Sequence, residues 1–144
     1  VYDGVFCDSD SAVERQFAID ADGDPQVLCF IKLPDFYVIP TPFGTYTPDF
    51  GLVLRGKSLS GKGGRDAFHF VIETKGTNDL NDPRALTDDE RRRIACAMRH
   101  FAAIGIRTVT PLPYADTPPP PENADRDAYV APVKDFKADF KEKV

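Results

Sequence analysis

The sequence lacks the features that mark membrane, secreted and zinc-binding proteins. No apolar run approaches the roughly 18 residues that a membrane-spanning helix needs, and the N-terminus lacks the basic-then-apolar order of a signal peptide. The cysteines Cys7, Cys29 and Cys96 are odd in number and form no C-x-x-C pair, which argues against a disulfide framework or a zinc site. We therefore expect a cytoplasmic protein with reduced, mostly buried thiols and no membrane partner.

The length of the chain favours one compact domain. At 144 residues and 42% hydrophobic content, it can bury roughly two thirds of its unfolded surface around a single core. It begins at Val1, in a segment that is typical of a strand and has no initiator methionine. This beginning suggests a piece of a longer protein with further domains.

The acidic charge is concentrated at one end. The net charge is −5, and residues 1–24 alone carry seven acids against Arg15, so the remaining chain is nearly neutral. A DNA-facing surface is therefore permitted. Basic residues form two clusters, Arg55, Lys57, Lys62 and Arg65 in the first and Arg91, Arg92, Arg93 and Arg99 in the second. A solvated loop and a solvated helix face would produce the same clusters.

The hydrophobic pattern predicts an α/β fold with the order α-β-β-β-α-β, in which helices flank a mixed sheet. Helices are expected over 11–20 and 87–104, each opened by a capping-box pattern, and Gly105 fits the stop of the second. Strands are expected over 27–32, 46–54, 66–75 and 106–110, the last of them parallel in the same sheet. Residues 34–42 are typical of an extended edge or loop.

The composition changes after Pro111. Residues 117–121 favour an extended polyproline conformation, and the stretch 135–143 has only Phe136 and Phe140 to bury. We therefore expect one domain over 1–112 and a Pro-rich segment with a helical tail over 113–144, attached as an appendage.

Residues 51–58, G-L-V-L-R-G-K-S, match the phosphate-loop pattern G-x-x-x-x-G-K-[ST] in every letter. A phosphate loop must connect a strand to a helix, because the helix N-terminus binds the anion. Here Leu52 to Arg55 continue a strand, and glycines follow Ser58 in place of a helix. The match without its context is weak evidence for nucleotide binding.

Two acids and a lysine are predicted to meet at one sheet edge. Side chains alternate along 67–75, so Glu73 and Lys75 share a face, and a hairpin between strands 46–54 and 66–75 would bring Asp49 beside Glu73. Two carboxylates held this close favour a bound Mg²⁺, with the Thr74 carbonyl as a further ligand. Lys75 could orient the attacking water or stabilise the charge that develops on the phosphorane. A solvated ion pair at a strand end would leave the same pattern.

The pattern P48-D49…E73-T74-K75 resembles the PD-(D/E)XK nuclease superfamily, whose core has the same α-β-β-β-α-β order. The resemblance is closest to the C-terminal endonuclease domain of the restriction (Res) subunit of type III restriction enzymes. It rests on the run I39-P-T-P-F-G-T-Y-T-P-D-F50 and on the stretches that begin at Tyr2, Lys32, Phe70 and Glu90.

This resemblance implies a Mg²⁺-dependent endonuclease that cleaves double-stranded DNA with Asp49, Glu73 and Lys75 as catalytic residues. Its implied partners are a helicase motor domain of the same subunit and a modification methyltransferase subunit. ATP and S-adenosylmethionine would then serve only those parts, which this chain does not include.

Further residues have an open role in this scheme. Glu14 could complete the metal site, as a first-helix acid often does in this superfamily, or could only cap the helix. Arg93 and His100 lie on one stripe of the second helix with Cys96. This stripe could lie near the DNA phosphate, or it could be packed in the interior. Lys57, Lys62 and Arg65 are expected to contact DNA phosphates. The alternative function is a catalytically silent nuclease fold that binds DNA or docks a partner.

Overall fold

The computed structural model describes residues 11–56, 67–122, 124 and 126–144. Lys57, Lys62, Arg65 and Cys7 lie outside these residues. Within the described part of the chain, no helix combines the length and apolar character needed to span a membrane. Cys29 is exposed and Cys96 is half-buried, so the expectation of mostly buried thiols is wrong for Cys29.

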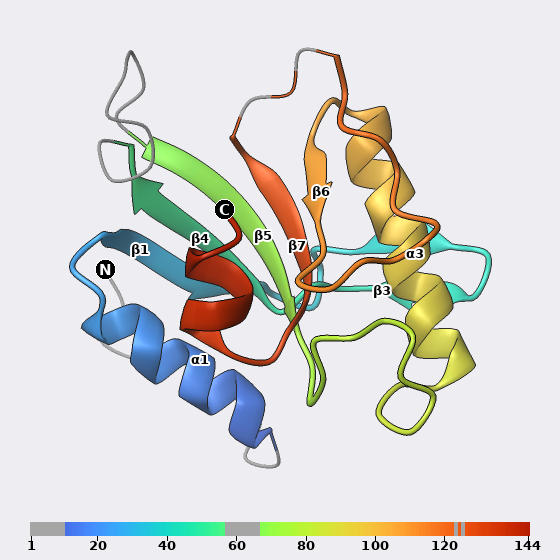
Figure 1. The fold of residues 1–144 in the computed structure, drawn as a ribbon, viewed down its shortest axis with the longest axis horizontal. Coiled ribbons are helices and arrows are strands. Elements are labelled where there is room, and N and C mark those ends of the chain that lie inside the picture. Colours follow the sequence, from blue (N-terminus) through green and yellow to red (C-terminus); the bar gives the residue numbers. More distant parts are fainter. Residues whose placement is uncertain (1–10, 57–66, 123, 125) are drawn as a thin grey trace.

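The central sheet has five strands in the order β1-β4-β5-β7-β6 (Figure 1). β1 (Val27–Lys32), β4 (Phe50–Arg55) and β5 (Ala67–Thr74) form an antiparallel meander, whereas β7 (Ala128–Val133) is parallel to both β5 and β6 (Arg107–Val109). The expected hairpin between the second and third strands is confirmed, and so is the parallel orientation of the strand that follows the second helix.

The expected strand over 46–54 is divided in the structure. β2 (Ile39–Thr41) and β3 (Gly44–Tyr46) form a separate two-stranded hairpin, and β4 starts only at Phe50. Gly44 has a φ of +106°, a conformation that glycine adopts at little steric cost and that allows the tight turn of this hairpin. The chain therefore turns between Tyr46 and Phe50, and this turn carries Asp49.

The segment expected as an appendage belongs to the sheet and the core. All six residues of β7 are buried, and the strand lies between β5 and β6. The short π-helical segment η1 (Phe136–Lys141) then adds Phe136 and Phe140 to the core. The expectation failed because Pro132 argues against a central strand, and because β7 is separated from β5 by more than 50 residues of chain.

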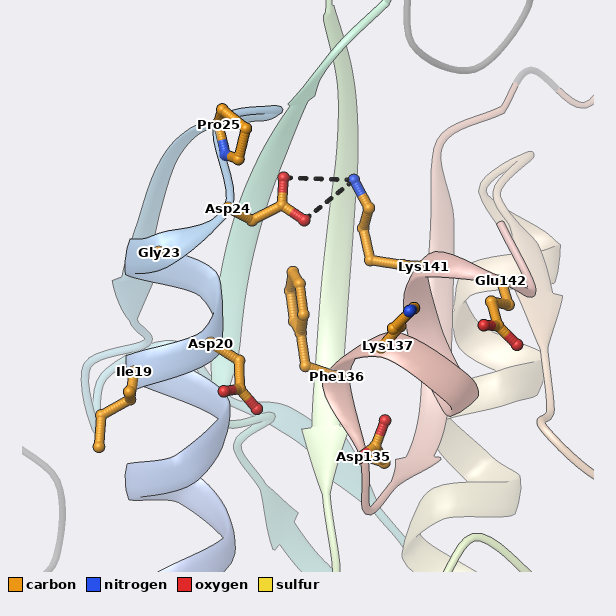
Figure 2. Close-up of a pocket in the computed structure, with 10 residues that line it drawn as sticks. All are labelled: Ile19, Asp20, Gly23, Asp24, Pro25, Asp135, Phe136, Lys137, Lys141 and Glu142. Atoms are coloured by element: carbon orange, nitrogen blue, oxygen red, sulfur yellow. Dashed lines mark hydrogen bonds and ion pairs between the residues drawn. The ribbon is translucent and has the colours of Figure 1, made fainter.

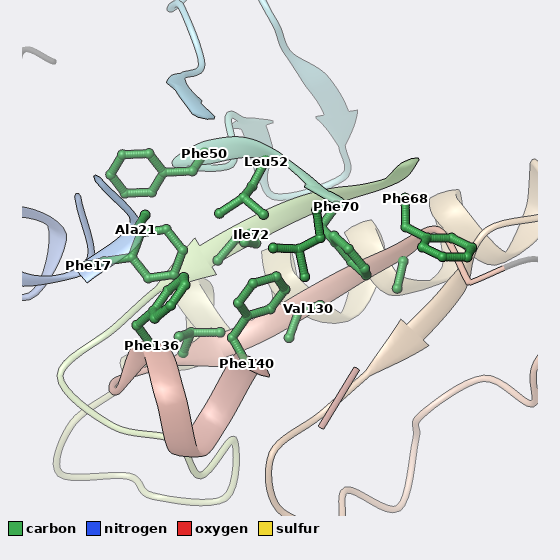
Figure 3. Packing of buried hydrophobic residues seen from close by; sticks show 13 residues of the cluster. Phe17, Ala21, Phe50, Leu52, Phe68, Phe70, Ile72, Val130, Phe136 and Phe140 are labelled. Carbon is green, nitrogen blue, oxygen red and sulfur yellow. The ribbon is translucent and has the colours of Figure 1, made fainter. Parts of the chain in front are cut away.

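Helices cover both faces of the sheet. α1 (Ala12–Gly23) and η1 pack on one face, over an aromatic cluster that includes Phe17, Phe50, Phe70 and Phe140 (Figure 3). The Phe17 and Phe50 rings stack with centroids 5.0 Å apart. α3 (Asp88–Ala103) packs on the other face (Figure 1).

α3 begins and ends at the signals that its sequence contains. Thr87 and Glu90 form the full capping box, in which each side chain bonds to the backbone of the other residue. Ile94, Met98 and Phe101 are buried against the sheet, and Gly105, with a φ of +87°, follows the last turn. α3 is thus held in a fixed position, with its first turn beside the end of β5.

Candidate active site

Asp49 and Glu73 meet where β4 begins and β5 ends. The register pairs Phe50 with Ile72, and the Asp49 amide donates to the Ile72 carbonyl at 3.1 Å. The Asp49 carboxylate accepts hydrogen bonds from the backbone amide and the hydroxyl of Thr74, at 2.8 and 2.6 Å. The hairpin therefore brings together the two acids that the sequence pattern singled out, and Thr74 orients one of them.

Glu73 is a buried acid with few charges to balance it. Its side chain accepts a hydrogen bond of 2.8 Å from the Tyr46 hydroxyl, and Lys75 Nζ lies 3.1 Å from its other oxygen. The Tyr46 and Tyr129 hydroxyls lie 2.7 Å apart, which extends the buried network. Burial, and then the charge of Asp49, raise the pKa of Glu73 to about 8, despite the opposing effects of Lys75 and Tyr46.

This shift predicts how stability depends on pH in metal-free protein. Between pH 4.5 and about 8, folded Glu73 holds a proton that the unfolded chain releases, so the free energy of unfolding should fall as pH rises through this range. We expect the Glu73→Gln variant, which cannot ionise, to show a shallower fall. Urea unfolding in EDTA at several pH values measures both slopes, and parallel slopes would contradict the prediction.

Lys75 lies between two acids from different elements. Its ammonium is 3.1 Å from Glu73 and 3.3 Å from Glu90, which belongs to the first turn of α3. Burial alone would lower the pKa of Lys75, but these neighbouring carboxylates outweigh burial and raise it. Lys75 therefore stays a cation, with its ammonium held next to Glu73.

Lys32, the last residue of β1, joins the site from the other side. Its ammonium lies 2.5 Å from the Glu14 carboxylate and 3.1 Å from Asp49 Oδ1. Burial alone would lower the pKa of Lys32. The hydrogen bonds and charges of the two acids together outweigh burial, so the pKa is raised. The Glu14 amide bonds to the Ser11 side chain as a cap would require, while the Glu14 carboxylate is directed to Lys32.

The donor set at Asp49 and Glu73 fits a hard divalent cation. Mg²⁺ is commonly bound by one or two carboxylates together with water molecules, and here burial, followed by the charge of the neighbouring Asp49 carboxylate, raises the pKa of Glu73. Asp49 and Glu73 would hold such an ion. Among the described residues there is no group of three or more acids, histidines or cysteines able to hold a metal, so water and the backbone would supply the other ligands.

The other expected DNA-contacting residues have different positions. Arg93 is half-buried and donates from Nε to the Phe43 carbonyl at 3.1 Å, so it attaches the β2–β3 hairpin to α3. His100 is exposed in the last turn of α3, roughly 15 Å along the helix from Glu90 at 1.5 Å per residue. The alternative of buried packing is therefore wrong for His100.

Sequence reasoning did not assign Lys32, Tyr46, Tyr129 or Glu90 to the site. Lys32, Tyr46 and Glu90 lie in the stretches that carry the resemblance, and this was an available signal for all three. The sequence pattern assigned Glu90 only a capping role. Tyr129 carried no signal, because its strand had not been expected.

The phosphate-loop interpretation is not compatible with the fold. Gly51 to Arg55 lie within β4, which pairs with β1 and β5, so the residues of the motif cannot wrap around a phosphate. Lys57 and Ser58, at which the helix of that motif would begin, lie outside the described residues.

A hollow of about 710 Å³ lies away from these acids, between the end of α1 and η1 (Figure 2). Asp24 and Lys141, 3.3 Å apart, are among its lining residues, whereas Asp49, Glu73 and Lys75 are not. The hollow is therefore not part of the candidate active site.

Comparison with known proteins agrees with this geometry. A family model described as an endonuclease domain matches residues 1–115, which is most of the chain. No curated protein and no solved structure matches the chain. The mixed five-stranded sheet flanked by helices is consistent with a restriction-endonuclease-like fold. The chain belongs to this family of endonuclease domains.

Proposed function

We propose that this chain is a Mg²⁺-dependent DNA endonuclease domain that hydrolyses one strand of the duplex per active site. The observation that carries the proposal is the convergence of Asp49, Glu73 and Lys75 at one sheet edge. Membership of an endonuclease family supports nuclease activity in general. A second copy of the domain would cut the other strand.

Asp49, Glu73 and Lys75 have different roles in the proposed reaction. A bound Mg²⁺ would polarise a phosphate oxygen and make water a stronger nucleophile. Asp49 and Glu73 would hold the cation, and Thr74 keeps Asp49 oriented through two hydrogen bonds. Lys75, held by Glu73 and Glu90, lies where a cation can orient the attacking water or stabilise charge that develops on the phosphate.

The finer proposal is that the domain belongs to a type III restriction-modification enzyme. Its support is the run over 39–50, which forms the β2–β3 hairpin and the turn that carry Tyr46 and Asp49 into the site. On this proposal a helicase motor of the same subunit and a modification methyltransferase are its partners, and these use ATP and S-adenosylmethionine. Lys57, Lys62 and Arg65 would contact DNA phosphates.

One observation favours the alternative of a catalytically silent DNA-binding or docking module. Each carboxylate oxygen of Asp49 and Glu73 already has a nearby donor or cation from the protein, namely Lys32, Thr74, Tyr46 or Lys75. A silent module would keep these contacts and would bind DNA without any need for a metal.

Metal-dependent nicking distinguishes the two functions. We expect the chain to convert supercoiled plasmid to nicked circles in Mg²⁺ or Mn²⁺, and to leave the plasmid intact in EDTA. DNA binding that is equal with and without metal, together with intact plasmid in both metals, would favour the silent module and contradict the proposal.

A further inference from the structure

Lys32 forms a charged bridge that the proposed reaction does not use. Its ammonium contacts Glu14 from α1 and Asp49 from the turn before β4, at 2.5 and 3.1 Å. It also lies 5.1 Å from the centre of the Phe50 ring in β4, within the range of a cation–π contact. Three neighbours from outside β1 thus hold this ammonium in one place.

The acids on the two sides of Asp49 differ in which lysine contacts them. On one side, a single ammonium bridges Asp49 and Glu14, and both carboxylate side chains are only 15% exposed. On the other side, Lys75 contacts Glu73 and Glu90. Lys75 Nζ lies within ion-pair distance of Glu73, and it acts on Asp49 only through a longer-range charge interaction. A single ammonium therefore contacts both Asp49 and Glu14, whereas in the pair Asp49 and Glu73 the Lys75 ammonium contacts Glu73 alone.

A divalent ion between Asp49 and Glu14 would have to displace Lys32. The displaced ammonium would lose two carboxylate partners and the Phe50 ring, and a partly buried charge without partners is costly. Between Asp49 and Glu73 a cation would instead relieve the repulsion of two neighbouring carboxylates. The two positions next to Asp49 are thus unequal for a metal.

We infer that Lys32 takes the place of a second metal ion, so that the site binds one divalent cation, held by Asp49 and Glu73, while Glu14 positions Lys32. The inference rests on the proposed metal-dependent function and adds the number of metals and the role of Glu14. Lys32 is a positioning residue in this arrangement, because it acts through Asp49.

Counting bound Mn²⁺ tests the inference without an activity assay. Mn²⁺ accepts the same oxygen ligands as Mg²⁺, and titration followed by electron paramagnetic resonance measures how many ions the full chain binds. We expect one Mn²⁺ per chain in the wild type. We expect two in Lys32→Met, because the Glu14 and Asp49 carboxylates then lack their cation, and one again in the double variant Glu14→Gln/Lys32→Met.

Lys141→Met is the matched control. Lys141 is also a partly buried lysine in an ion pair, with Asp24 at 3.3 Å, but it lies beside the hollow between α1 and η1 (Figure 2). Removing its charge should leave the count at one. If Lys32→Met does not fold, Lys32→Gln replaces it with the same expected count of two, because a neutral amide does not occupy the site as a cation.

Each other outcome overturns a defined part of the scheme. Two Mn²⁺ ions in the wild type, or one in a folded Lys32→Met variant, would show that Lys32 does not exclude a second metal and would overturn the inference. No bound Mn²⁺ in any variant would instead contradict the metal-dependent function itself, and the inference with it. Two ions in Lys141→Met would show that the extra site arises from any loss of positive charge and would also overturn the inference.

Discussion

Lys75→Ala is expected to reduce Mg²⁺-dependent nicking by on the order of a hundredfold to a thousandfold, the usual effect of removing one group that stabilises charge in a transition state. The variant should still fold. Without the ammonium, Glu73 keeps its hydrogen bond to Tyr46 and, with its pKa already raised to about 8, can remain protonated in place of being a buried anion. Nicking rates and thermal unfolding, measured side by side, check both parts of this prediction.

Lys141→Ala is the control for a general loss of positive charge. Lys141 contacts Asp24 at the other end of α1, remote from the acids of the site, so its loss should leave nicking unchanged. Equal nicking by Lys75→Ala and the wild type would remove Lys75 from the mechanism. Equal losses in the two lysine variants would point to weaker DNA binding as the common cause.

Asp49→Ala should abolish nicking, but its effect is less easily interpreted than that of Lys75→Ala. Asp49 accepts two hydrogen bonds from Thr74 and one from Lys32, so its removal leaves the two Thr74 donors without this acceptor, whereas Lys32 keeps its contact with Glu14. Each such group costs about 1–3 kcal/mol of stability. A loss of activity in this variant therefore counts only if its unfolding shows that the domain is intact at the assay temperature.

Local signals in the sequence were sufficient to predict much of the fold and the centre of the site. The capping box at Thr87 and the glycine at 105 mark the ends of α3 through short-range hydrogen bonds and backbone preference. The approach of Asp49 to Glu73 followed from a hairpin, in which the side-chain alternation of two adjacent strands determines which residues meet. Interactions of this kind depend on residues close together in the chain.

The residues that were not anticipated depend on contacts between distant parts of the chain. Tyr129 reaches Tyr46 only because β7 pairs with β5 in parallel. Parallel strands are not joined by a tight turn, so the sequence contains no turn signal that predicts this pairing. Lys32 joins the site because the end of β1 lies beside the first turn of α1, a proximity that no spacing along the chain encodes. The role of Glu14 stayed open for the same reason. The neighbouring residues in the sequence predict the hydrogen bond of its backbone amide to Ser11, but not the ion pair of its carboxylate with Lys32.

A chain that ends at residue 115, where the family match stops, is expected not to fold. It would lack β7, whose six residues are all buried, and it would separate β5 from β6 in the sheet. It would also lack Phe136 and Phe140, and deletion of a buried phenylalanine side chain typically costs about 3–5 kcal/mol. These two losses alone are comparable with the roughly 5–15 kcal/mol that stabilises a typical domain.

Circular dichroism and urea unfolding of the shortened chain measure this effect. We expect no cooperative transition, whereas full-length Phe36→Ala should unfold almost as the wild type does, because Phe36 is 86% exposed and makes little contribution to the core. Cooperative unfolding of the shortened chain at the wild-type midpoint would restore the view of residues 113–144 as an appendage. The expected result would instead mean that the endonuclease fold of this protein depends on a strand outside the family match. The same strand carries Tyr129, whose hydroxyl lies 2.7 Å from that of Tyr46 in the network that contacts Glu73.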